Sequence, residues 1–171
     1  LVDIAVVVSR DTKKVSSSEG HALALASPFW PARLASMNDR LALVRRAIWE
    51  RDFALFGREV EAEALSMHAV ALTSAHMDGE AWRSGVYYLL PDTLAILLAV
   101  QEWREQGLPV YFTLDAGPTV HLLCLAEHAD ALAEQVQHLA DEQGRTWELI
   151  VNHPGGGAVI VGDPHGQPAR I

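Results

Sequence analysis

At 171 residues, half of them hydrophobic, the chain is long enough for one well-packed domain and short for two. Its formal net charge of −9 offers no basic stripe to neutralise phosphates, so a nucleic-acid partner is not expected. The sequence shows no apolar span of membrane-crossing length and no charged-then-apolar leader, and we therefore predict a cytoplasmic protein without a membrane partner.

The first predicted elements are a strand and a hydroxyl-rich helix start. The chain opens directly on the apolar run of residues 1–8, so we expect it to be part of a larger protein. Ser16 and Ser17 precede an Ala/Leu-rich run, and serine is a good helix N-cap, which makes capping the simpler interpretation. The alternative is an anion site, because hydroxyls and free N–H groups at a helix start suit a phosphate or carboxylate. The lysines Lys13 and Lys14 just upstream favour the same anion.

Two long helices are predicted next from their apolar periodicity. The first begins near Pro31, and the second is capped by Asp52 and carries His68. The predicted core-facing residues of the first helix are Met37, Leu41, Val44 and Ile48. Its arginines, Arg40, Arg45, Arg46 and Arg51, fall largely on the other side, where we predict a solvated face. A lone histidine on a helix is more often a packed residue than a ligand, which is the first interpretation of His68.

The second half of the sequence predicts a loop over residues 78–85 and a helix from Pro91 to a stop at Gly107. Apolar runs at 109–114 and 119–125 flank a short break, and a helix over 127–143 follows. Further strands are predicted at 147–151 and 158–161, around a glycine turn. This order predicts an α+β domain, a mostly antiparallel sheet of four or five strands covered by helices on one side. The pattern fits a ferredoxin-like plait with additional helices.

The break between the two central runs holds a single carboxylate, Asp115, followed by Ala116, Gly117 and Pro118. Gly117 is able to take a positive φ, and Pro118 fixes φ and donates no N–H, so the break predicts a tight connection. The simpler interpretation of Asp115 is a turn-initiating residue bonded to its own backbone. The functional alternative is a carboxylate with a ligand or a proton to bind, because burying it uncompensated is costly.

Several catalytic signatures are absent from the sequence. There is no phosphate loop with a Gly-Lys-(Ser/Thr) ending and no His-Glu-x-x-His pair, and we predict no metal site. The single cysteine, Cys124, lies in an apolar run without a nearby base, which indicates a buried and inert thiol.

Five stretches resemble one enzyme family in the same order along the chain. The run Tyr111-Phe112-Thr113-Leu114-Asp115-Ala116-Gly117-Pro118 is similar to the Phe-Thr-x-Asp-Ala-Gly-Pro-Asn signature of the mevalonate diphosphate decarboxylases, members of the kinase superfamily that includes galactokinase and homoserine kinase. Lys13-Lys14-Val15-Ser16-Ser17, residues 47–53, Met67-His68-Ala69 and Asp92-Thr93 resemble further family stretches. All of these belong to the C-terminal half of such enzymes.

The resemblance implies an ATP- and magnesium-dependent carboxy-lyase of isoprenoid biosynthesis. Such an enzyme phosphorylates the 3-hydroxyl of a phosphorylated mevalonate, which then loses phosphate and carbon dioxide to give an isopentenyl product. Asp115 matches the catalytic aspartate, and Ser17 matches a serine that binds the substrate phosphate. Ser16 is a weaker neighbour of that serine. Ala116 and Gly117 are expected to let substrate approach the backbone, and His68 occupies a shared position with a structural or supporting role.

Some positions depart from the family pattern. Thr119 stands where the family usually has Asn, and Ser18 stands where bacterial members often carry an Arg. The segment 75–85 is longer than in typical relatives. Loss of a cation near the terminal phosphate suits a monophosphate substrate, so a phosphomevalonate decarboxylase is the alternative. A non-catalytic ligand-binding or dimerisation module, and a kinase that does not decarboxylate, are the further alternatives.

The resemblance also implies a missing half. Residues 1–171 are expected to form a single domain, the C-terminal half of a two-lobed enzyme whose N-terminal lobe carries most of the ATP and Mg²⁺ binding. The chain alone is therefore predicted to be inactive. Its expected partners are the phosphorylated mevalonate, the N-terminal lobe and a second copy in a homodimer.

Overall fold

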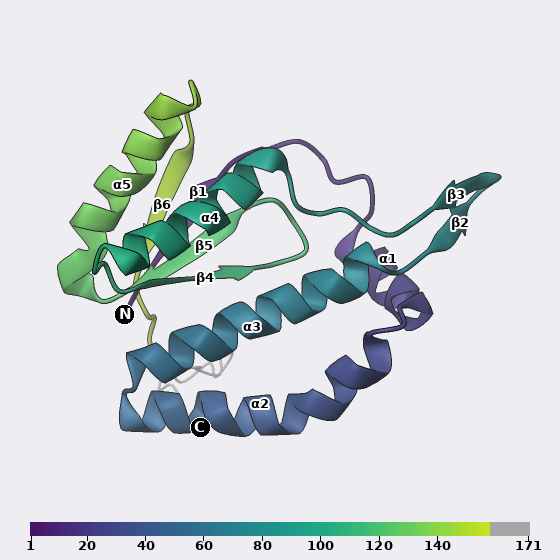
Figure 1. Ribbon diagram of the computed structural model, residues 1–171, viewed down its shortest axis with the longest axis horizontal. Coiled ribbons are helices and arrows are strands. Elements are labelled where there is room, and N and C mark those ends of the chain that lie inside the picture. Colours follow the sequence, from purple (N-terminus) through teal and green to yellow (C-terminus); the bar gives the residue numbers. More distant parts are fainter. Residues whose placement is uncertain (158–171) are drawn as a thin grey trace, which may run out of the picture.

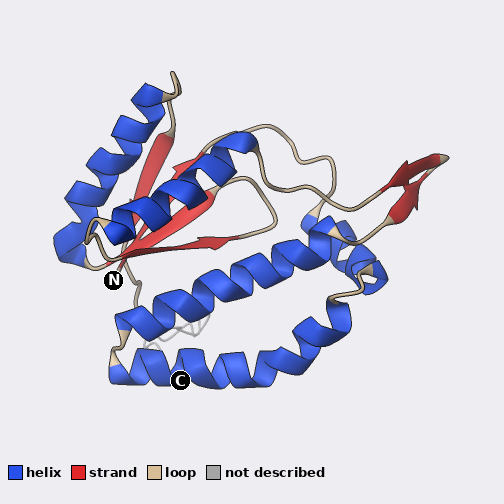
Figure 2. Cartoon of the chain, viewed as in Figure 1, coloured by secondary structure: helices blue, strands red, loops and turns tan. Residues whose placement is uncertain are grey.

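A computed structural model, which describes residues 1–157, shows a four-stranded antiparallel sheet with helices around it (Figures 1 and 2). The strands are β1 (Val2–Val7), β4 (Val110–Leu114), β5 (Val120–Cys124) and β6 (Glu148–Asn152). They lie in the order β4-β5-β1-β6. Numbered along the chain within this sheet alone, that order is 2-3-1-4, the order of a ferredoxin-like plait. The predicted fold class is confirmed.

Residues 1–157 also form five α-helices. They are α1 (Ser17–Leu23), α2 (Trp30–Glu50), α3 (Phe53–Leu72), α4 (Pro91–Glu105) and α5 (Ala129–Glu142). Short 3₁₀ helices, η1 (Ala24–Ala26) and η2 (Ala126–His128), extend α1 and precede α5. The predicted cap at Asp52 and stop at Gly107 are confirmed. The Asp52 side chain accepts a hydrogen bond from the Leu55 backbone N–H at 2.9 Å, and Gly107 follows α4 with a φ of 96°. Gly144 follows α5 in the same way, with a φ of 63°.

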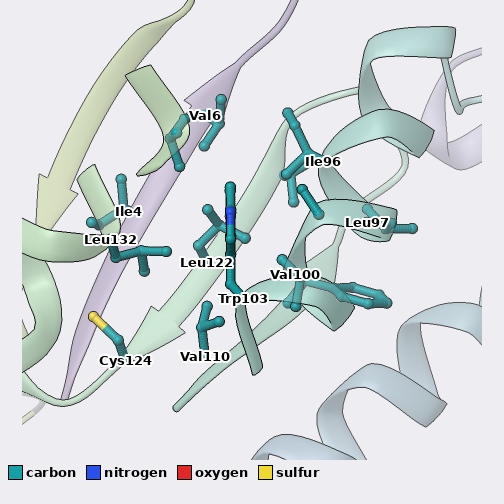
Figure 3. Close-up of a cluster of buried hydrophobic side chains, with 14 of the residues drawn as sticks. Ile4, Val6, Ile96, Leu97, Val100, Trp103, Val110, Leu122, Cys124 and Leu132 are labelled. Atoms are coloured by element: carbon teal, nitrogen blue, oxygen red, sulfur yellow. The ribbon is translucent and has the colours of Figure 1, made fainter. Parts of the chain in front are cut away.

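The hydrophobic core lies between one face of the sheet and the helices α4 and α5. Alternation along the strands turns Ile4, Val6 and Leu122 toward these helices, and all three are fully buried. From the helices, Ile96 and Leu132 pack into the same cluster, as Figure 3 shows. Cys124 lies in this cluster, and burial raises the pKa of its thiol, which agrees with the predicted inert cysteine.

The helix α3 runs beside the free edge of β4, with α2 packed against it (Figure 1). The Glu61 carboxylate on α3 accepts the Phe112 backbone N–H at 3.1 Å, and Arg104 of α4 donates to the Val110 carbonyl at 3.0 Å. These side chains satisfy backbone groups that an edge strand otherwise exposes. The prediction that helices cover one side of the sheet is therefore correct for α4 and α5. It is incomplete, because α2 and α3 form an additional layer along the β4 edge of the sheet.

Two predicted details were wrong. Leu41 and Ile48 of α2 face solvent, and Arg40 faces α3, where it pairs with Glu59 at 3.2 Å. The predicted loop at 78–85 contains part of a hairpin, β2 (His76–Asp78) and β3 (Ala81–Arg83), which projects away from the body of the domain in Figure 1. The strand predicted at 158–161 lies outside the described residues. Within residues 1–157 no helix has the length and apolarity that a membrane crossing requires.

Candidate functional site

A cavity of about 460 Å³ opens where the first strand ends and the loop between β4 and β5 begins. Its walls are the connector that follows β1, from Val7 to Lys13, and the loop from Asp115 to Thr119. His121 and Ile150 contribute from the sheet, on the face turned away from α4 and α5. Polar and apolar groups therefore meet at one end of the sheet, as expected for a small-molecule site.

The carboxylate predicted to be catalytic stands exposed at this cavity. Asp115 directly follows β4, and its backbone carbonyl accepts the Gly117 N–H at 2.8 Å. The buried Thr93 on α4 donates its hydroxyl to the Pro118 carbonyl at 2.8 Å and so anchors the far side of the loop. Gly117 is not among the glycines with positive φ in residues 1–157, so the loop does not use the freedom that the sequence suggested. A Cβ at Gly117 would approach only the Lys13 side chain, at 3.9 Å, which leaves the backbone open to a ligand.

Lys13 joins the loop from Asp115 to Thr119 to Ser17. Its ammonium donates to the Ala116 carbonyl at 2.6 Å and to the Ser17 hydroxyl at 3.2 Å. The Lys13 ammonium therefore brings Ser17 to the loop that holds Asp115, Ala116 and Gly117, and Lys13 lines the cavity with these three loop residues. An ammonium beside a hydroxyl and an exposed backbone is suited to an anionic group such as phosphate.

Ser16 has a structural role at the start of α1. Its hydroxyl accepts the Glu19 backbone N–H at 3.2 Å, and the Glu19 carboxylate accepts the Ser16 N–H at 3.4 Å, which forms a capping box. The Tyr88 hydroxyl donates to the Ser16 carbonyl at 3.1 Å. Burial raises the pKa of Tyr88, with a further contribution from Glu19, so the phenol keeps the proton that it donates.

His68 lies near the Asp115 backbone and does not line the cavity. It is only 2% exposed, and neither ring nitrogen has a hydrogen-bond partner among the described residues. Its ring meets the Tyr88 ring edge-on, with centroids 6.2 Å apart. Burial lowers the pKa of His68, and the Asp115 backbone and the Glu63 carboxylate oppose this only in part, so the imidazole is neutral near pH 7.

Sequence reasoning did not single out Arg10 or His121 as cavity residues, and it mentioned Lys13 only as a neighbour of the serines. A signal for His121 is present in the sequence, because one polar side chain interrupts the apolar run of β5. Asp3 interrupts the apolar run of β1 in the same way. Strand pairing brings these two residues together, and that pairing is not readable from the sequence alone. The described residues contain no group of three or more His, Cys, Asp or Glu side chains that could hold a metal ion.

Comparison with known proteins gives the same family as the motifs. Residues 4–155 match the family model described as the mevalonate 5-diphosphate decarboxylase C-terminal domain. The chain is 29% identical over 135 residues to a phosphomevalonate decarboxylase of Haloferax volcanii, covering 78% of this chain and 39% of that protein. It is 30% identical over 132 residues to a diphosphomevalonate decarboxylase of Saccharomyces cerevisiae, covering 74% of this chain and 31% of the yeast protein.

The fold agrees with a solved structure of the decarboxylase MDDEF in complex with MVAPP (mevalonate diphosphate), the ATP analogue AMPPCP and magnesium. The TM-score is 0.72 at 28% identity, and the match covers 88% of this chain and 42% of that one. The chain thus spans less than half the length of the relatives that it matches. With the family model matching most of its residues, the chain belongs to the family of mevalonate 5-diphosphate decarboxylase C-terminal domains.

Proposed function

We propose that this chain is the substrate-binding and catalytic C-terminal domain of an ATP-dependent decarboxylase that acts on a phosphorylated mevalonate. The observation that carries the proposal is the position of Asp115 at a cavity, on a loop that Lys13 links to Ser17. A proton acceptor and anion-binding groups at one cavity are what the phosphorylation of an anionic alcohol requires.

In this proposal Asp115 orients the 3-hydroxyl group and accepts its proton. The hydroxyl oxygen forms a bond to the γ-phosphorus of ATP, and the bond from that phosphorus to ADP breaks. The new phosphate then leaves with its C–O bonding electrons. The bond to the carboxylate carbon breaks in turn, and its electron pair forms the alkene of the isopentenyl product as carbon dioxide departs.

The neighbouring residues have distinct proposed roles. Ser17 and the Lys13 ammonium bind the substrate phosphate, and Ala116 and Gly117 allow close approach to the backbone. Ser16 was expected to bind substrate too, but its hydroxyl caps α1, and we propose that it fixes the position of Ser17. His68 is buried behind the loop, which favours a positioning role over direct contact with substrate.

ATP and Mg²⁺ are proposed to bind mainly through the N-terminal lobe, which these residues do not include. The described part of the chain has no acidic or histidine cluster of its own that fits a metal ion, so we place no step on a metal held here. Magnesium, where it is bound with ATP, neutralises the charge of the phosphates during transfer.

Two substrates fit the proposal, and we give precedence to mevalonate 5-diphosphate because of the matching family model. Mevalonate 5-phosphate is the second candidate, favoured by the name of the Haloferax volcanii relative and by Ser18, which replaces the arginine of bacterial members.

The test joins the chain to the upstream segment of its gene and supplies ATP, Mg²⁺ and either substrate. We expect ADP and carbon dioxide from one of them, and an Asp115→Asn variant that is slower by about 100-fold or more, since a positioned base contributes that much. Asp39→Asn, which neutralises an exposed carboxylate on α2, is the matched control and should keep full activity. ADP without carbon dioxide would indicate a kinase. Neither product with either substrate would leave the non-catalytic module as the better hypothesis.

We also propose a cytoplasmic homodimer. The support is an exposed apolar stripe along α2, formed by Leu34, Leu41, Ile48 and Trp49, whose last member is 90% exposed. Sedimentation of the complete protein should show a dimer, and Leu41→Lys with Ile48→Lys should shift it toward monomer. A wild-type protein that sediments as a monomer at micromolar concentration would contradict this proposal.

A further inference from the structure

A row of three polar side chains crosses the sheet on the face away from the core. Asn152 of β6 lies opposite Asp3 of β1, and His121 of β5 lies opposite Ala5, one diagonal step from Asp3. The His121 Nδ1 atom is 3.0 and 3.1 Å from the two Asp3 carboxylate oxygens, and the Asn152 amide donates to Asp3 at 3.4 Å. The residues on either side of Asp3 and of His121 in their strands are apolar, and Thr113 of β4 lies opposite His121.

The Asp3 carboxylate determines which nitrogen of the His121 imidazole carries a proton. A carboxylate only accepts hydrogen bonds, so the Nδ1 atom of His121 carries a proton. This leaves Nε2, for which residues 1–157 provide no hydrogen-bond partner. The two side chains are 27% and 30% exposed, which means that they are partly desolvated but reachable. Such a carboxylate–histidine pair fixes the ring orientation.

His121 also lines the cavity that holds Asp115. The cations Arg10 and Lys13 line the same cavity, as do the anions Asp11 and Asp115. Arg10 pairs with Glu148, and Lys13 is bonded to Ala116 and Ser17. When both ring nitrogens carry a proton, His121 donates from Nδ1 to Asp3 and from Nε2 to a second acceptor, and only then is it a third positive donor among the residues that line the cavity.

We propose that His121, held by Asp3 and Asn152, contacts an anionic oxygen of the ligand that occupies this cavity. The oxygen belongs to a carboxylate or a phosphate, both of which accept from an imidazolium. This inference rests on the proposed function for the identity of the ligand, and the contact itself rests on the geometry of the row. His121 is then a determinant of substrate affinity in addition to Asp115 and Ser17.

Three substitutions of His121 distinguish the role of its Nδ1 atom from that of its Nε2 atom. The amide nitrogen of Gln reaches roughly the position of Nε2, whereas that of Asn reaches roughly the position of Nδ1. In the complete protein with saturating ATP, His121→Val and His121→Asn should raise the KM for the phosphorylated mevalonate about 10-fold, the loss of one charged hydrogen bond, with kcat changed little. His121→Gln should retain most of the affinity. His138→Gln, which alters an exposed histidine paired with Glu142 on α5, is the control.

A purely structural role predicts the opposite ranking, because Asn preserves the bond to Asp3 and Gln does not. Retained KM in His121→Asn with loss in His121→Gln would therefore overturn the proposal, as would an unchanged KM in all three variants.

If the complete protein has no decarboxylase activity, ligand titration still tests whether His121 contacts an anion. The imidazole nitrogen resonances of the ¹⁵N-histidine-labelled protein are followed with mevalonate, which carries only the carboxylate, and with inorganic pyrophosphate. A saturable shift of the His121 Nε2 signal with mevalonate identifies a carboxylate contact, and one with pyrophosphate identifies a phosphate contact. If neither probe moves the His121 signal while other signals of the cavity shift, the proposal is wrong, whatever reaction the protein catalyses.

Discussion

His68 of α3 is a neutral side chain held in the interior near the backbone of Asp115. Its pKa is lowered by burial from the ordinary value of 6.5. The unfolded chain therefore binds a proton that the folded chain excludes, in the pH range between 6.5 and the lower folded value. The stability that depends on neutral His68 is present above pH 6.5 and is lost as the pH falls through that range.

The direction of this pKa shift predicts how the stability of the fold depends on pH. The free energy of unfolding, measured by urea denaturation, should fall between pH 7.5 and 5.5 with a contribution from His68 of at most about 1.4 kcal/mol per pH unit. His68→Gln should be less stable at pH 7.5 and show a shallower pH dependence. His138→Gln, whose side chain is 71% exposed, should keep the wild-type slope. An unchanged slope in His68→Gln would show that this histidine is not the titrating group.

The sequence identified part of the site because some roles depend on local geometry. Asp115 stands out as a carboxylate on a short break between two apolar runs, and the resemblance added Ser17. His121 and Asp3 gain their meaning only from the pairing of β5 with β1, more than a hundred residues apart in the chain. Lys13 likewise reaches across to Ala116. Contacts of this kind are set by tertiary structure, which residue patterns do not encode locally.

At the level of elements, the position of α1 depends on a close contact with the segment before α4. Gly20 lies against the Tyr88 hydroxyl, and a Cβ at this position would overlap it. Because Tyr88 also bonds the Ser16 carbonyl, the contact holds the first turn of α1 beside Lys13. A larger side chain at residue 20 would therefore shift Ser16 and Ser17.

Gly20→Ala should lower the free energy of unfolding by about 1–3 kcal/mol, the usual cost of overpacking. In the complete protein it should also raise the KM for the phosphorylated substrate, because the serines move. Gly155→Ala is the control, since nothing lies within 4 Å of the added Cβ. Adding Tyr88→Phe to Gly20→Ala should recover part of the loss by removing the overlapping hydroxyl. Equal stability of the two alanine variants would refute the packing argument.

The helices also show where periodicity is ambiguous. In α5, Leu132 and Val136 are buried, because its apolar residues occupy one face. In α2 apolar residues lie on more than one face, so the 3.6-residue period does not indicate which face meets α3. The ion pairs of Arg33 with Glu63 and of Arg40 with Glu59 select the face that holds them. A charged arginine usually suggests an exposed position, but Arg33 and Arg40 lie at the contact between α2 and α3.

At the scale of the whole molecule, the domain has its own hydrophobic core. It supplies only some of the residues of the proposed active site, because the groups that bind ATP are proposed to lie in the N-terminal lobe. The match covers less than half of the length of each relative, and phosphoryl transfer needs groups that hold ATP. We expect the chain produced alone to unfold cooperatively on heating and to release no carbon dioxide from either mevalonate phosphate. Joining it to the upstream segment should restore the reaction. Turnover by the chain alone would mean that these residues are sufficient for ATP binding.

The place of β1 in the sheet has a consequence for synthesis on the ribosome. Among the elements of this domain, the strand is translated earliest but occupies an interior position, between β5 at residues 120–124 and β6 at 148–152. Its two ladders therefore close only after nearly the whole domain has emerged, and pairings so distant in sequence slow folding. The helices α2 and α3 contact each other locally and are free to associate much earlier. β1 has no strand partner until residues 120–124 arrive, and one of its edges stays unpaired until residue 152. During this interval the nascent chain is most exposed to aggregation and most dependent on chaperones.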